Sequence, residues 1–142
     1  MEVHLRLRHL LPFVVAGCQA NPYAAATDAE LHAKARALAL PARYNLYVEV
    51  LHSRIPSRPI IAEDIAVFGS PAWGYVLERA LSGGSVELSQ ALPVLFAFGR
   101  RCSQNELDQL RDHASEEASA EQAVALRSSI DSMCGAALPA GD

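Results

Sequence analysis

Apolar residues recur every three or four positions through most of the chain after residue 27, which is the spacing of helices that bury one face. Strict alternation of apolar and polar residues, which is typical of strands, is confined to residues 3–8. The pattern therefore predicts an all-α fold. We expect six to seven helices, paired antiparallel and stacked in a small bundle or a short array.

Capping residues set the expected ends of these helices. Thr27, Ser103 and Ser119 each stand three residues before a Glu or Gln, which is the capping-box pattern. Ser70 and Ser85 are expected to cap two further helices. The predicted helices cover about 27–39, 41–55, 59–68, 70–82 and 85–98, followed by two that open at residues 103 and 119.

The helix over 70–82 has the clearest core-facing stripe, formed by Trp73, Val76, Leu77, Ala80 and Leu81. Its wet face carries Tyr75 and Arg79. Arg100 and Arg101 follow the end of the next helix, where the helix dipole favours cations. We take Tyr75, Arg79, Arg100 and Arg101 as candidate contacts for a partner, and the two arginines also suit lipid phosphates or acidic groups.

The segment Phe68-Gly69-Ser70-Pro71-Ala72-Trp73, its helix to Leu81, the turn Ser82-Gly83-Gly84-Ser85 and the helix ending in Gly99 resemble a HEAT-type helical repeat. That family shows a Gly turn, Pro-Ala, an apolar helix, a short polar turn and a second helix ending in Gly. The match covers about residues 61–100. One repeat does not make a solenoid, but the resemblance implies antiparallel helix pairs stacked in sequence, as a short HEAT-like array.

The first 18 residues resemble a bacterial lipoprotein signal. Arg6 and Arg8 give a positive start, residues 10–15 form an apolar run shorter than a membrane span, and Val15-Ala16-Gly17-Cys18 matches the lipoprotein box. The resemblance implies a signal peptide over 1–17, acyl chains on Cys18 and a lipidated tether over 18–26. Gln19 resembles lipoproteins sent to the outer membrane. The alternation over 3–8 leaves an edge strand open, with Cys18 as a small core residue.

The chain has three cysteines, an awkward number for an exported protein unless one of them carries lipid. Cys102 opens one of the last two predicted helices and Cys134 closes the other. An antiparallel hairpin brings those ends together, so we expect a disulfide that persists in the periplasm, with two buried free thiols as the alternative. A single domain is expected over 27–135, followed by a disordered tail over 136–142.

Charge and the scarcity of reactive groupings restrict the function. The net charge is −4, and removing residues 1–17 takes away two basic residues and one acidic residue, leaving −5. Nucleic acid is therefore not an expected partner, because phosphate binding needs a basic face. His32, His52 and His113 lie on different predicted helices without a second ligand at metal spacing, and are expected to be exposed. We expect no metal, no cofactor and no enzymatic activity.

These inferences together predict a lipid-anchored periplasmic protein that binds a protein partner at the outer membrane. Size, address and helix content are similar to the pilotins, which escort secretin subunits to the outer membrane. The similarity implies a secretin or another envelope component as the partner. Two alternatives remain open: an inhibitor of a secreted hydrolase that uses the loop from Ile55 to Pro59, and a cytosolic helical adaptor without a signal peptide.

Overall fold

The structure is a computed structural model that describes residues 21–135. The predicted signal peptide, Cys18 and the tail over 136–142 lie outside the described residues. Residues 21–135 form helices and no strand, which confirms the all-α prediction. The helices are α1 (Asp28–Arg36), α2 (Leu40–Ser53), α3 (Ala62–Ala66), α4 (Ser70–Ser82), α5 (Ser85–Ala97), α6 (Gln104–Glu117) and α7 (Ala120–Ile130), which continues into a π-helical turn, η1 (Asp131–Gly135).

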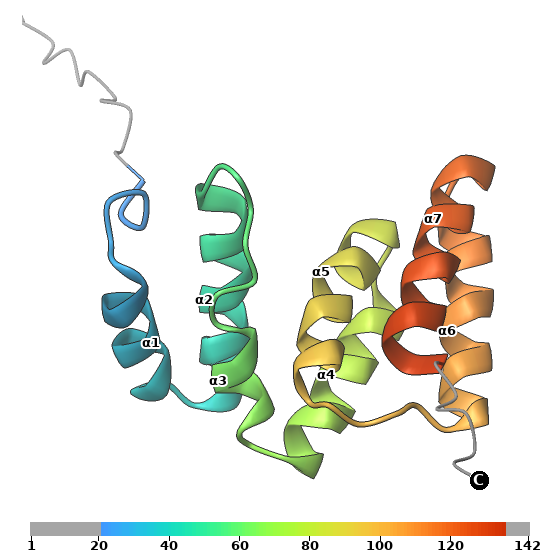
Figure 1. The fold of residues 1–142 in the computed structure, drawn as a ribbon, viewed down its shortest axis with the longest axis horizontal. Coiled ribbons are helices and arrows are strands. Elements are labelled where there is room, and N and C mark those ends of the chain that lie inside the picture. Colours follow the sequence, from blue (N-terminus) through green and yellow to red (C-terminus); the bar gives the residue numbers. More distant parts are fainter. Residues whose placement is uncertain (1–20, 136–142) are drawn as a thin grey trace, which may run out of the picture.

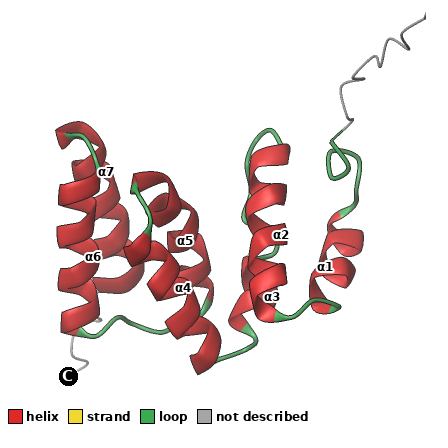
Figure 2. Ribbon diagram, turned by 180° about the vertical axis from the view of Figure 1, so that it is seen from behind, coloured by secondary structure: helices red, strands yellow, loops and turns green. Residues whose placement is uncertain are grey.

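The helices follow one another across the molecule in the order of the sequence (Figure 1). The pairs α4–α5 and α6–α7 are antiparallel hairpins, and α3 packs against α2, α4 and α5. The view from behind shows the same row, with α1 at one edge and α6–α7 at the other (Figure 2). The last turn of α2 and the first turns of α5 and α7 lie at the same end of the helices, which is the top of the row in Figure 1.

Three predicted capping boxes are present, at Thr27, Ser103 and Ser119. The predicted caps at Ser70 and Ser85 are wrong by one residue, since α4 begins after Gly69 and α5 after Gly84. Gly69 has a φ of 70°, a conformation that glycine adopts without strain, and this turn already places Ser70 in the helix. At α5 the carboxylate of Glu87 accepts a hydrogen bond from the Gly84 N–H at 2.9 Å, so the helix starts earlier.

The third helix is shorter than predicted, because only Ala62–Ala66 is α-helical in the stretch from 59 to 68. The Ala62 N–H donates to the Pro59 carbonyl three residues back, as a turn does, and the N–H groups of Phe68 and Gly69 also bond three residues back. Tightened hydrogen bonding at both ends thus leaves a five-residue helix.

The hydrophobic core runs through the whole row, and Trp73 lies in it as predicted, with 4% of its surface exposed. The ring of Trp73 meets the ring of Phe98 edge to face, with centroids 5.4 Å apart. The hydroxyl of Tyr47 donates to the Gln90 carbonyl at 2.7 Å, which ties α2 to α5. Phe68 lies at the margin of this core, 38% exposed, with its ring centre 4.3 Å from the guanidinium of Arg43.

Candidate functional site

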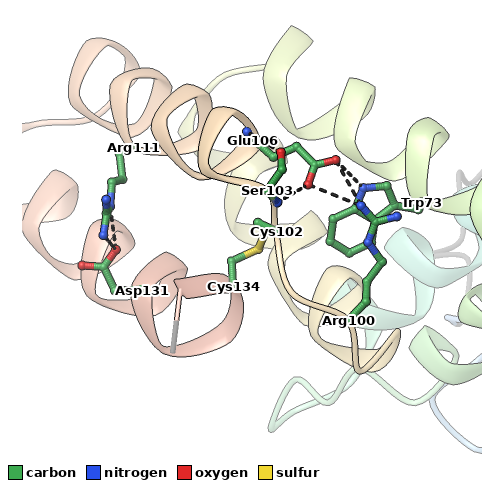
Figure 3. The surroundings of a disulfide bond; sticks show 8 residues. All are labelled: Trp73, Arg100, Cys102, Ser103, Glu106, Arg111, Asp131 and Cys134. Carbon is green, nitrogen blue, oxygen red and sulfur yellow. Dashed lines mark hydrogen bonds and ion pairs between the residues drawn. A yellow bond between two sulfur atoms is a disulfide. The ribbon is translucent and has the colours of Figure 1, made fainter. Parts of the chain in front are cut away.

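The predicted bond between Cys102 and Cys134 is present in the structure (Figure 3). Cys102 stands just before α6 and Cys134 lies in η1, with their Cα atoms 5.0 Å apart. The Cys102 N–H also donates to the Cys134 carbonyl at 3.3 Å. The disulfide therefore closes the α6–α7 hairpin at the end opposite its turn, and Cys134 is buried.

Glu106 joins α4, the α5–α6 connection and α6 in one polar cluster beside the disulfide (Figure 3). Its carboxylate accepts hydrogen bonds from Trp73 Nε1 at 3.0 Å, from Arg100 at 3.2 Å and from the Ser103 N–H at 2.7 Å. Burial opposes ionisation of Glu106, but the Ser103 and Trp73 hydrogen bonds and the charge of Arg100 outweigh it, so its pKa lies below the ordinary value. The arrangement holds a carboxylate ionised and fixed.

The four candidate partner contacts lie in separate surroundings. The guanidinium of Arg100 lies 3.9 Å from the centre of the Trp73 ring and pairs with Glu106, while Arg101 is exposed. Tyr75 and Arg79 both lie against Tyr44, each 5.7 Å from its ring centre. Burial raises the pKa of Tyr44 to about 12, against the lowering effect of Arg79. Three of the four residues thus have partners inside the fold.

The three histidines also have partners inside the fold. His32 Nδ1 pairs with the Asp64 carboxylate, His52 Nε2 accepts from Gln90 Nε2 at 2.6 Å, and His113 Nε2 donates to the Gly83 carbonyl at 2.6 Å. His52 is exposed as expected, whereas His32 and His113 are half-buried. Among residues 21–135, no three His, Cys, Asp or Glu side chains are grouped in a way that suits a metal ion.

A buried charged cluster between α1, α2 and α3 was not predicted. The Asp64 carboxylate accepts from Arg36 Nε at 3.0 Å as well as pairing with His32. Arg43 is buried and donates to the Asp64 carbonyl at 2.6 Å and to the carbonyls of Arg36 and Leu38 at 3.0 and 2.9 Å. Each group is satisfied by the others, so the cluster fixes the end of α1 against α3.

A groove of about 620 Å³ opens where α5 lies between α2 and α7. Its lining has no Asp, Glu, Lys or Arg. It is formed by residues of these three helices and of the loop after α2: Leu51, His52, Ser57, Pro59, Ser85, Val86, Ser89, Gln90, Pro93, Gln122, Ala125 and Leu126. Val86, one of the lining residues, is 59% exposed. An uncharged groove of this kind suits an apolar segment better than an ion.

Pro93 changes the backbone hydrogen bonding of α5 beside the groove. Pro93 lies inside α5 and has no N–H, so the carbonyl of Ser89 receives no α-helical hydrogen bond. Both residues line the groove. The helix α5 therefore lacks one backbone hydrogen bond where it lines the groove.

The turn before α5 is filled by a side chain of the chain itself. The turn at Gly83 and Gly84 could cradle an anion at the start of α5. The Glu87 carboxylate already accepts the Gly84 N–H, and a Cβ at Gly83 would lie 2.4 Å from the Glu87 side chain. The N-terminus of α5 is therefore capped by its own carboxylate.

None of the described helices combines the length and the apolar character needed to cross a membrane. No protein-family model, curated protein or solved structure matches this chain. The resemblances to a lipoprotein signal and to a HEAT-type repeat accordingly stay predictions from the sequence.

Proposed function

We propose that this chain is an exported, lipid-anchored helical protein that binds a protein partner at the periplasmic face of the outer membrane. The observation that carries the proposal is the disulfide between Cys102 and Cys134. Disulfides persist in oxidising compartments and are rare in the cytosol. The pairing also leaves Cys18 as the remaining cysteine, which is what acylation at the lipoprotein box requires.

The groove between α2, α5 and α7 is the surface we propose for the partner. An amphipathic helix that docks in a groove buries its apolar face against neighbouring helices. Val86 and Leu126 offer apolar contact there, and the side chains of Ser89 and Gln122 offer polar contact. A secretin subunit or another envelope protein with such a helix fits a pilotin-like role, without enzymatic activity or a cofactor.

Intact mass of the protein extracted from membranes tests the anchor and the compartment together. The expected mass lacks residues 1–17, includes the lipid on Cys18 and is two hydrogens below the fully reduced value. A chain that retains its first residues and three free thiols would contradict export.

Two matched substitutions test the groove. Val86→Asp places a charge in the lining of the groove. Val124→Asp places the same charge on α7, at a residue that is 70% exposed and lies outside the lining. If the partner is a secretin, Val86→Asp reduces secretin multimers in the outer membrane as strongly as deletion of the gene, and Val124→Asp does not. Unchanged multimers after deletion would exclude the pilotin-like role.

A further inference from the structure

The loop between α2 and α3 presents an apolar side chain flanked by two cations. Ile55 is 100% exposed, with Arg54 before it and Arg58 three residues after it. A single exposed apolar residue is ordinary on a protein surface. The position of this one relative to the chain end and to the neighbouring charges makes it informative.

The chain that leads back to Cys18 leaves the fold beside this loop. Asn21 Nδ2 donates to the Ser53 carbonyl at 2.7 Å, and the Tyr23 hydroxyl bonds to Glu49 at 3.0 Å. Both contacts fix the start of the described chain on the last turns of α2. The α2–α3 loop lies at this same end of the helices, the top of the row in Figure 1. Cys18 is three residues before Asn21 in the sequence, so a lipid on it would be joined to this corner by a short length of chain.

The charges at this corner suit phosphate groups. Arg54 and Arg58 share one carboxylate, Asp28, at 2.9 and 3.5 Å, which leaves an excess of positive charge. The Arg58 side chain is 59% exposed. An open hollow of about 680 Å³ lies between the two arginines, Ile55 and Ala24. The acidic residues of the α6–α7 turn, Glu116, Glu117 and Glu121, lie at the same end of the helices but on the far side of the row from this corner (Figure 1).

We propose that this loop contacts the surface of an anionic phospholipid bilayer, with Ile55 among the upper acyl chains and Arg58 on a lipid phosphate. The inference rests on the proposed function, because the lipid on Cys18 would hold this corner at the membrane. One apolar side chain and one exposed cation bind a bilayer weakly without such an anchor. The contact therefore fixes this corner of the domain at the bilayer.

Tryptophan quenching tests the contact in the full chain. Ile55→Trp adds a fluorophore at the loop. Val67→Trp adds one at the α3–α4 connection, which lies at the opposite end of the helices, the bottom of the row in Figure 1; Val67 is 75% exposed. Each protein is bound to vesicles of equal parts phosphatidylethanolamine and phosphatidylglycerol with brominated acyl chains. The buried Trp73 gives a constant background that the parent protein measures.

Bromine is expected to quench about half or more of the added emission at position 55 and almost none at position 67, since quenching requires contact with acyl chains. Arg58→Glu in the Ile55→Trp protein, or vesicles of phosphatidylcholine alone, should reduce the quenching. Equal emission in brominated and ordinary vesicles at position 55, or no binding to vesicles, would overturn the inference; the first outcome would leave the loop for a protein partner. The mass at Cys18 is measured separately, so an unlipidated protein with a quenched loop would contradict the anchor and not the contact.

Discussion

The indole nitrogen of Trp73 donates a hydrogen bond to Glu106 across 3.0 Å, so a core residue of α4 also fixes the first turn of α6. The same carboxylate receives the Ser103 N–H and the Arg100 guanidinium. One side chain thus caps a helix, joins two hairpins and holds an arginine on an aromatic ring. Removing the Glu106 carboxylate would take the shared acceptor away from all three donors.

Replacing Trp73 with Phe keeps an aromatic ring in the core and removes the hydrogen bond to Glu106. We expect the free energy of unfolding to fall by about 2 kcal/mol, from the lost charge-assisted bond and a weaker contact with Arg100. Urea denaturation followed by circular dichroism measures the change. Phe98→Leu removes the neighbouring ring and leaves the hydrogen bond, so it separates packing from polar loss; an unchanged midpoint for Trp73→Phe would contradict the role of the bond.

The lowered pKa of Glu106 makes stability depend on acid pH. Because the folded-state pKa lies below the unfolded value of about 4.5, its contribution is complete above that pH and is lost as the pH falls through the folded pKa. In Glu106→Gln the free energy of unfolding should therefore fall less below pH 4.5 than in the parent protein. Denaturation at a series of pH values measures this, and parallel curves for the two proteins would contradict it.

Glu30 provides a comparison for this experiment. Its pKa is also lowered, first by the hydrogen bond from the Thr27 N–H and then by the Thr27 hydroxyl. It is exposed, so solvent screens its charge. We expect Glu30→Gln to reduce the loss of unfolding free energy at acid pH less than Glu106→Gln does, although both carboxylates belong to capping boxes.

Reduction of the Cys102–Cys134 bond should lower the free energy of unfolding by about 3–4 kcal/mol, because the bond closes a loop of 32 residues in the unfolded chain. Denaturation with and without a dithiol reductant measures the difference. Cys18→Ser is expected to keep the full response to reductant. A double Cys102→Ser, Cys134→Ser variant should already be destabilised and show no response, and a large response there would point to another cause.

Arg43→Lys should destabilise the protein by about 2–3 kcal/mol even though the charge is kept, because one ammonium group cannot reach the three carbonyls that the guanidinium bonds. Arg36→Lys is the matched control. Its side chain is 72% exposed and pairs with the same Asp64, so a cost below about 1 kcal/mol is expected. Similar thermal midpoints for the two variants would contradict this ranking.

The sequence predicted the elements of the fold well because the signals for helices are local. Capping boxes at Thr27, Ser103 and Ser119 depend on residues three positions apart, and all three are present. The hairpin of the last two helices was likewise enough to bring Cys102 and Cys134 together. The short α3 was overestimated, since tightened turns at both of its ends depend on how the chain packs on α2 and α5.

The polar clusters were beyond sequence reasoning because their members meet only in three dimensions. His32 and Asp64 are 32 residues apart, and Trp73 and Glu106 are 33 apart. Arg43 directly precedes the core residue Tyr44, and this position does not indicate that the guanidinium of Arg43 is buried. The groove also depends on three helices from distant parts of the chain.

The linear stacking of the helices affects which parts of the molecule open locally. Contacts are made mostly between elements that are close in sequence, so the two edges of the row can open without disturbing each other. The edge at α6–α7 is covalently closed, whereas α1 is held by hydrogen bonds and packing. Amide protons of α1 should consequently exchange with deuterium sooner than those of the disulfide-closed hairpin, and transient opening would begin at the α1 edge of the row.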